Sequence, residues 1–265
     1  MTEGAIRIVH QTSHLFPRPV EVGEIEVCLE PLGASFHQVV VTPIAAEESR
    51  WHDAFGNPRK RLLVRGPFER LEVTAVSTVP RRPDGAWRER FASLVSRDGL
   101  VAPSPRVPHL VATRDFAREV LVGATLRERL VSFVEALARS ATFDTAATDV
   151  DTPLERFVAT RRGVCQDFAH FTLACLRSQG IPAAYLGGYH ARLTQAGRSH
   201  AWVAAHDAAQ DAWIALDPTL GTLDADDHVV VAVGRDYDDV PPLSGVLAYE
   251  GTCRTVSRVR VEATT

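Results

Sequence analysis

The stretch RRGVCQDFAHFTLACLRSQGIP, residues 161–182, predicts a helix that begins at Cys165 and ends before Gly180. At about 100° per residue, one broad arc of this helix is apolar, which indicates a helix packed into a core. The members of the arc are Cys165, Phe168, Ala169, Phe171, Thr172, Leu173, Cys175 and Leu176. A thiol in the first turn lies beside unpaired N–H groups and the positive end of the helix dipole, which favour the thiolate. Cys165 is therefore a candidate nucleophile, although a lone cysteine is more often a buried filler.

A second segment, SHAWVAAHDAAQDAWIALD at residues 199–217, has two alternating apolar runs and predicts an antiparallel hairpin. With the turn centred between Ala208 and Ala209, His200 faces Asp217 across the two strands. Directly opposed residues have Cβ atoms roughly 4.5–5.5 Å apart, so the carboxylate can hold the imidazole. A slip of one residue would send one of the two to the other face. No Asn-Gly or Asp-Gly pair supports a two-residue turn, so we expect a four-residue loop with the same centre.

Cysteine, histidine and aspartate in this order can supply a nucleophile, a base and a group that orients the base. The segments that contain them resemble the transglutaminase-like core of the papain-type cysteine enzymes: GVCQDFAH (163–170), GIPAAYLGGY (180–189), SHAW (199–202) and WIALDPT (213–219). DAFGN (53–57) and GRDYDDVPPLSGV (234–246) resemble parts of the bacterial branch, in which a β-rich domain precedes the core. The resemblance implies Cys165 as nucleophile, His200 as base and Asp217 as orienting acid. It implies neither a metal nor an organic cofactor.

Other polar residues compete for these roles. His190 and His206 are alternative bases, and only the hairpin and the resemblance favour His200 over them. His206 lies six residues further along the same predicted strand, about 20 Å from His200, which is too far to serve the same thiol. We expect His170 to bond to backbone or water, and Asp167 to stabilise the helix N-terminus.

The hydrophobic period changes along the chain and predicts an α+β fold. Short alternating runs over residues 5–80, broken by proline and glycine, are typical of a small antiparallel sandwich. A stretch rich in proline and glycine follows and predicts a linker around one short helix. From Thr113 the period is helical, with a capping box at Thr125 and Glu128, and strands return after the nucleophile.

These patterns place the domain boundary before residue 109. We expect an N-terminal β-sandwich-like domain over residues 1–100 and a papain-like, transglutaminase-like core over residues 109–265. In this core the nucleophile lies at a helix N-terminus packed on an antiparallel sheet. The C-terminal strands, predicted at 228–233 and 252–263, are assigned to the core.

Composition excludes several classes of function. The net charge is −4 and no arginine cluster exceeds two or three residues, so the sequence predicts neither nucleic-acid binding nor a membrane-binding basic patch. No apolar run approaches the ~20 residues of a membrane span, and the first residues lack a leader pattern, so we expect a cytoplasmic protein. The four cysteines show no CxxC spacing and are expected to be reduced thiols, with Cys175 a buried filler.

Together these features predict a cysteine enzyme that attacks peptide or carboxamide carbonyls of a peptide or protein substrate through a thioester intermediate. Crosslinking transglutaminases use an upstream tryptophan indole to bind the oxyanion, and this chain has no tryptophan between Trp87 and Trp202. We therefore favour hydrolysis, as a peptidase or amidase. Transamidation of protein glutamine and a non-catalytic binding module are the alternatives.

Overall fold

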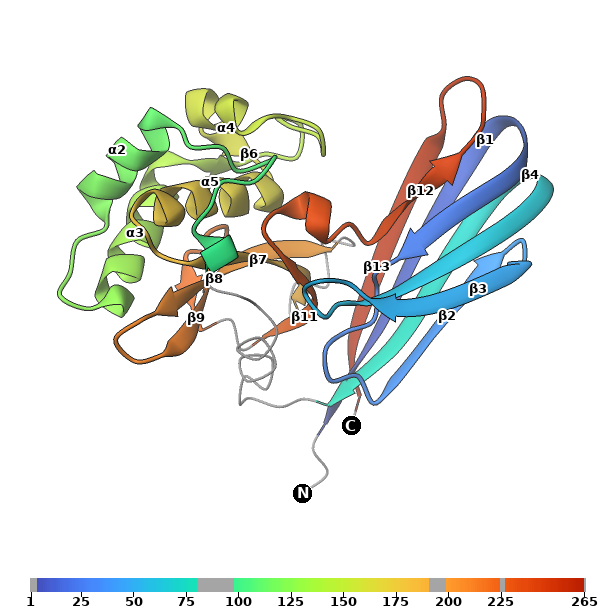
Figure 1. Cartoon of the computed structure of the whole chain (residues 1–265), viewed down its shortest axis with the longest axis horizontal. Helices are drawn as coiled ribbons and strands as arrows, with labels where there is room; N and C mark the ends of the chain where they lie inside the picture. Colours follow the sequence, from blue (N-terminus) through green and yellow to red (C-terminus); the bar gives the residue numbers. More distant parts are fainter. Residues whose placement is uncertain (1–3, 81–97, 191–198, 225–226, 265) are drawn as a thin grey trace.

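The computed structural model describes residues 4–80, 98–190, 199–224 and 227–264, and contains two large antiparallel sheets and one group of helices (Figure 1). One sheet is built from both ends of the chain. The other lies with the helices in the middle of the chain. The predicted α+β class is confirmed.

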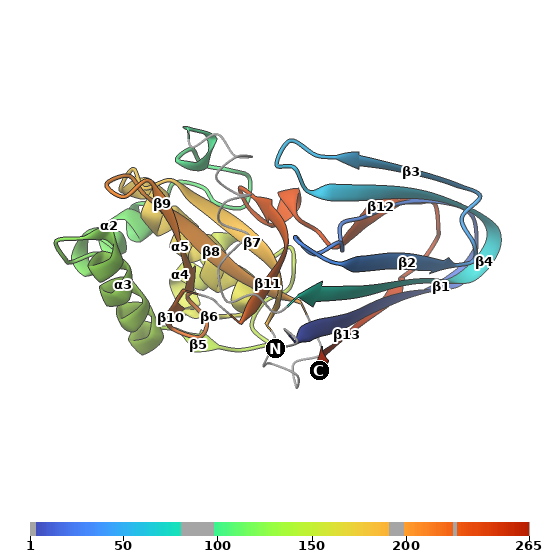
Figure 2. The same ribbon diagram turned by 90° about the horizontal axis from the view of Figure 1, so that it is seen from below.

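The first sheet has six strands and encloses its own hydrophobic core. Figure 2 shows the curl of this sheet from a second side. Its two long strands, β1 (Ala5–Val27) and β4 (Pro58–Pro80), pair almost from end to end. β2 (Phe36–Thr42) and β3 (Glu47–His52) each pair with a different half of β4. Where short strands were expected, two 23-residue strands are found. One sheet can enclose a core because the β1–β4 register is irregular between Leu15 and Val22.

The last two strands complete this first sheet. β12 (Leu243–Leu247) pairs with the second half of β1, and β13 (Arg254–Thr264) pairs with the first half. The predicted core over 109–265 included these strands, and here the structure differs from the expectation. β4 occupies only one edge of β1, so the other edge would otherwise present unpaired N–H and C=O groups. The boundary between residues 100 and 109 stays a prediction.

The second sheet has the strand order β10-β9-β8-β7-β11. Its strands are β7 (Ala183–His190), β8 (His200–Asp207), β9 (Ala212–Asp217), β10 (Thr222–Leu223) and β11 (His228–Gly234). The helices beside it are α2 (Val111–Val120), α3 (Leu126–Ser140), α4 (Leu154–Thr160) and α5 (Cys165–Ser178). The remaining short elements are η1 (Asp98–Leu100), β5 (Thr142–Phe143), β6 (Arg162–Gly163) and η2 (Tyr237–Asp239). α5 packs on β7 and β8 and is itself covered by α2 and α4, which explains its nearly complete burial.

Local signals fix the helix ends. α3 begins with the predicted capping box, in which Thr125 Oγ1 accepts the N–H of Glu128 at 3.2 Å and the Glu128 carboxylate accepts the N–H of Thr125 at 3.1 Å. α5 begins at Cys165, as predicted. Gly180 follows its end with φ +72°, a conformation that glycine adopts without strain.

The two sheets share one hydrophobic cluster. Ile6 and Ile8 of β1 and Val261 of β13 belong to the same buried cluster as the apolar residues of α5. His10 of β1 also bonds to the hydroxyl of Tyr189 in β7, at 2.8 Å. The first sheet is therefore joined to the core by buried apolar and polar contacts.

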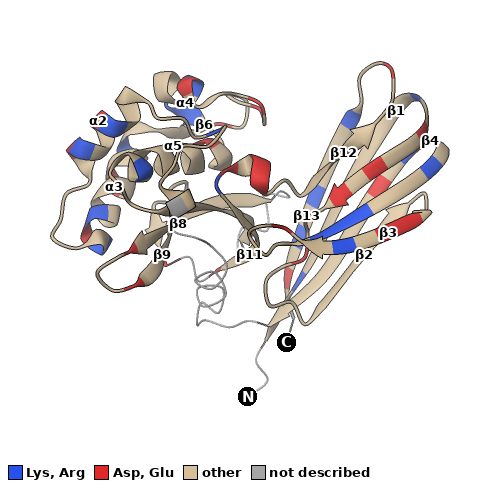
Figure 3. Ribbon diagram, viewed as in Figure 1, with Lys and Arg blue, Asp and Glu red and all other residues tan. Residues whose placement is uncertain are grey.

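Residues with charges of both signs are interspersed along the ribbon in both parts of the molecule, as Figure 3 shows. Several form ion pairs across strands of the first sheet, such as Arg61 with Glu24 at 3.2 Å. Exposed pairs of this kind contribute little stability individually. Within the described residues, no helix has both the length and the apolar character needed to cross a membrane.

Candidate active site

Cys165 is the first residue of α5, and local bonds fix where this helix begins. The Asp167 carboxylate accepts the N–H of Val164 at 2.7 Å and the hydroxyl of Thr148 at 2.6 Å, which stabilises the helix N-terminus as expected. Burial raises the pKa of Asp167, and these hydrogen bonds offset only part of that rise. A Cβ at Gly163 would lie 2.5 Å from Asp167 Oδ2, so this turn needs glycine. The partly exposed thiol of Cys165 is thus held at the positive end of a helix.

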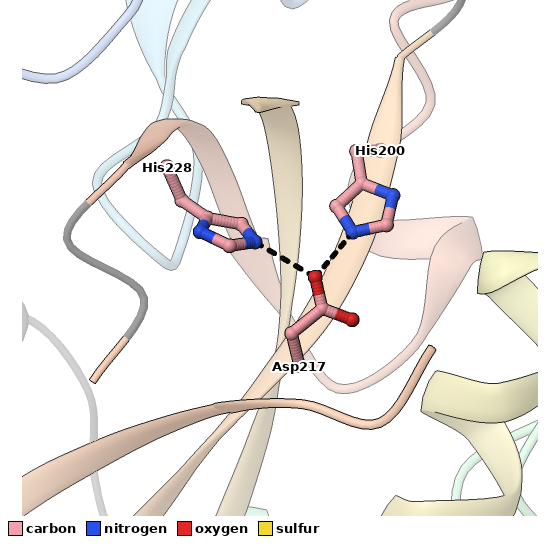
Figure 4. Close-up of side chains that lie close together, drawn as sticks. All are labelled: His200, Asp217 and His228. Atoms are coloured by element: carbon pink, nitrogen blue, oxygen red, sulfur yellow. Dashed lines mark hydrogen bonds and ion pairs between the residues drawn. The ribbon is translucent and has the colours of Figure 1, made fainter. Parts of the chain in front are cut away.

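The topology of the second sheet gathers three polar residues at one end. His200 begins β8, Asp217 ends β9 and His228 begins β11. In an antiparallel sheet the start of one strand lies near the end of its neighbour. Figure 4 shows both imidazoles directed at the Asp217 carboxylate. His228 is the first residue of the strand predicted at 228–233, but it was not among the predicted site residues.

The β8–β9 pairing differs from the predicted register by two residues. Ala204 lies opposite Ala215, so Asp217 is diagonal to His200 instead of directly opposite. Because side chains alternate with a period of two, a shift of two leaves both on the same face. The predicted contact between His200 and Asp217 is therefore present despite the error in register.

The loop of this hairpin explains the error. It has the expected four residues, between Asp207 and Ala212, but its centre lies one residue later than predicted. Asp207 forms a local turn by accepting the N–H of Ala209 at 3.0 Å. Asp211 has φ 49°, in the left-handed region that aspartate tolerates better than most residues.

His200 is held by hydrogen bonds and by an aromatic ring. Its Nε2 lies 2.6 Å from Asp217 Oδ2, and its ring stacks on Trp202 with an interplanar angle of 19°. Burial lowers the pKa of His200, but hydrogen bonds with Asp217 and with Cys165 outweigh burial and raise it to about 10. The imidazole is therefore favoured in its protonated form, which stabilises a neighbouring anion.

Asp217 accepts four hydrogen bonds in a fully buried position. Oδ2 accepts from His200 and, at 2.8 Å, from Nε2 of His228, while Oδ1 accepts the N–H groups of Thr219 and Leu220. Burial alone would raise the pKa of Asp217, but the hydrogen bonds from the two imidazoles outweigh burial and hold the pKa well below its usual range. The group is therefore a carboxylate at any ordinary pH.

Cys165 and His200 line one cavity of about 130 Å³. Its walls are largely apolar, and Cys28 and Leu29, which directly follow β1, contribute part of them. Tyr185 also lines it, and burial raises the pKa of its phenol well above the usual value, so the O–H keeps its proton. Cys165, His200 and Tyr185 thus line one cavity in a mostly apolar setting.

The competing histidines lie elsewhere or make other contacts. His206 is buried beside Asp211 at 3.2 Å, at the opposite end of β8 from His200. Nε2 of His170 accepts the N–H of Tyr237 at 3.2 Å, which agrees with the expected backbone bond. His190 packs edge-on against His228, with ring centroids 4.6 Å apart.

His200, Asp217 and His228 offer the donor set of a metal site, with ligand atoms within 4.8 Å of one another. In the structure these atoms bond to each other at 2.6 and 2.8 Å, and each Nε2 must carry the proton that it donates. A metal ion would have to displace both protons and spread the three donors. The geometry therefore fits a hydrogen-bonded cluster better than a preformed metal site.

The comparisons with known proteins agree with this fold. Residues 114–218 match the model of the transglutaminase-like superfamily, and residues 6–80 match the bacterial transglutaminase-like N-terminal region. The chain is 30% identical over 278 residues to the uncharacterized protein ML0607 of Mycobacterium leprae, with 98% of each protein aligned. It is also 30% identical to the uncharacterized protein Rv2569c of Mycobacterium tuberculosis, over 85% of this chain and 80% of that protein.

Among solved structures, the crystal structure of a proposed cysteine protease from Cytophaga hutchinsonii superposes with a TM-score of 0.78, covering 99% of this chain and 91% of that chain. The two sequences are 17% identical, so the similarity shows a shared fold. The family matches and the mycobacterial relative together establish the family. The chain belongs to the transglutaminase-like superfamily, with the N-terminal region typical of its bacterial members.

Proposed function

We propose that the protein is a cysteine peptidase or amidase in which Cys165 is the nucleophile, His200 the base and Asp217 the residue that orients the base. The family and the fold support a cysteine-type enzyme in general. The single observation that supports these roles best is the position of His200, which lines the cavity of Cys165 and bonds to a buried carboxylate.

In the proposed reaction, Nδ1 of His200 holds the proton of the Cys165 thiol and the sulfur attacks the substrate carbonyl carbon. When the tetrahedral intermediate collapses, the C–N bond breaks and His200 gives its proton to the leaving amine. Water, deprotonated by the same imidazole, then attacks the thioester and releases a carboxylic acid and the thiol. The backbone N–H of Cys165 is the proposed first oxyanion donor, and Tyr185 is the candidate for the second.

A library of peptides incubated with the purified protein and analysed by mass spectrometry tests the proposal, with Cys165→Ala as the control. Fragments or released ammonia that depend on Cys165 would support hydrolysis. Transfer of an added primary amine to a glutamine peptide would show transamidation instead.

Alkylation by iodoacetamide near pH 6 separates an enzyme from an inert binding module without knowledge of the substrate. A thiolate held by an imidazolium reacts at this pH, whereas an ordinary thiol does so slowly. We expect Cys165 to react faster in the wild-type protein than in His200→Ala. Equal and slow alkylation of both proteins would favour the non-catalytic module.

A further inference from the structure

One carboxylate oxygen in this site accepts hydrogen bonds from two histidines. Asp217 Oδ2 lies 2.6 Å from Nε2 of His200 and 2.8 Å from Nε2 of His228, as drawn in Figure 4. The backbone N–H groups of Thr219 and Leu220 donate to the other oxygen, Oδ1, at 2.9 and 3.1 Å. A carboxylate has about four acceptor positions, and all four are filled here.

The two imidazoles differ in what their second nitrogen can do. Since the carboxylate only accepts, both rings carry the proton on Nε2. This leaves Nδ1 of His200 for the thiol. Nδ1 of His228 is buried and has no hydrogen-bond partner within the described residues. Among the described residues, His228 therefore has no group with which to exchange a proton, and its side-chain hydrogen bond is the one that it donates to Asp217.

His228 is also fixed in place. Its side chain is 3% exposed, and its ring centroid lies 4.6 Å from those of Trp202 and His190. Trp202 in turn stacks on the ring of His200. The second imidazole thus touches both the carboxylate and the ring that orient His200.

We propose that His228 is a positioning residue for the pair formed by Cys165 and His200. By sharing Asp217 Oδ2, it fixes the torsion of the carboxylate and hence the direction of the His200 ring. It also takes part of the carboxylate's charge, so Asp217 stabilises the imidazolium of His200 less than it would alone. The inference rests on the proposed function, because it concerns the reactivity of the same thiol.

Removing the donor should have two separate effects. With Oδ2 bonded to His200 alone, the carboxylate is less fixed, and a displacement approaching 1 Å in such a site costs up to about a hundredfold in rate. At the same time Asp217 attracts the imidazolium more strongly, so the pair should persist to higher pH. Three titratable side chains contact His228: Asp217, His200 and, from β7, His190. Asp227, which precedes His228 in the sequence, is the fourth titratable group nearby.

The test measures the rate constant for alkylation of Cys165 by iodoacetamide between pH 5 and 10.5, with the modified residue located by peptide mapping. For His228→Leu we expect a maximal rate about tenfold below wild type. We also expect the upper of the two pH values at which the rate changes to be higher than in wild type. For His228→Gln, whose amide reaches the same carboxylate oxygen, we expect a rate within about threefold of wild type. If the role of His228 were merely structural, the upper pH at which the rate changes would stay where it is in wild type. His228→Gln would then also react no faster than His228→Leu.

His206→Leu is the matched control. His206 is equally buried on the same sheet, pairs with Asp211 and packs on Trp213, but lies at the far end of β8. We expect it to leave the alkylation profile unchanged. If His206→Leu slows alkylation as much as His228→Leu does, the proposal is wrong.

A second pair of variants decides the matter if His228→Leu does not fold. Glutamine reaches Asp217 Oδ2 and asparagine is too short, so His228→Gln should react faster than His228→Asn. Identical profiles of these two, or a His228→Leu profile identical to wild type, would overturn the proposal. If instead the wild-type protein reacts no faster than His200→Ala, the proposed function itself has failed.

Discussion

Replacing His170 with glutamine should make the protein less sensitive to acid. His170 lies one turn after Cys165 on α5, and its side chain is buried against Tyr185. Its Nε2 accepts the N–H of Tyr237, so the ring must be unprotonated at this nitrogen. Burial, which Asp236 only partly offsets, lowers the pKa of His170 from 6.5 to about 3. Glutamine keeps an acceptor for Tyr237 but cannot titrate.

The magnitude follows from linkage. A histidine whose pKa is lower in the folded state contributes stability that is fully present above pH 6.5 and is lost as the pH falls toward the folded-state value. At pH 5 the folded ring is still neutral, while the unfolded chain has bound its proton. The distance of 1.5 pH units from the ordinary pKa, at about 1.4 kcal/mol per unit, predicts that His170 removes about 2 kcal/mol between pH 8 and pH 5.

Urea unfolding at several pH values between 5 and 8 measures this loss. The wild-type curve alone is ambiguous, because buried His10 has its pKa lowered to about 4 and acts in the same direction, whereas His200 has its pKa raised and stabilises the fold as the pH falls from about 10 to 6.5. The difference between wild type and His170→Gln isolates His170, provided that the two proteins have the same m-value. If both lose the same free energy of unfolding between pH 8 and pH 5, the argument from burial is refuted.

Three further substitutions test other contacts. Asn57→Ala removes the side chain that bonds both the N–H and the C=O of Val233, and should lower the free energy of unfolding by about 2–4 kcal/mol in urea titrations; a loss under 1 kcal/mol would contradict the predicted role. Gly188→Ala places a Cβ 2.0 Å from the carbonyl oxygen of Val229, so it should destabilise the protein by about 1–3 kcal/mol and slow alkylation of Cys165; an unchanged thermal midpoint would count against it. Thr125→Ala breaks the capping box of α3 far from the site and should cost about 1 kcal/mol while leaving alkylation unchanged, with Thr125→Ser restoring most of the loss.

The parts of the fold that depend on local chemistry could be predicted from the sequence. The start of α5 at Cys165 and the capping box of α3 follow from residues within a few positions of each helix end. The contact between His200 and Asp217 was also predicted, because an even shift of register preserves the face of each side chain.

The parts that depend on strand order could not be predicted. β13 alternates like any half-buried strand, and nothing in its residues says that its partner is β1 at the other end of the chain. His228 was missed for the same reason. A histidine at the start of a strand joins Asp217 only if β11 and β9 are placed in one sheet with their ends together, and the pattern of a single strand carries no such information.

β11 connects the two parts of the molecule. Its first residue, His228, bonds to Asp217, and near its other end the side chain of Asn57 pairs with the backbone of Val233 as a neighbouring strand would. β11 is an edge strand, so this contact satisfies groups that would otherwise lack partners. The first sheet therefore does more than cover the core. The residue directly after β1, Cys28, lines the Cys165 cavity, and the residue directly before β4, Asn57, binds β11, whose first side chain contacts the Asp217 carboxylate.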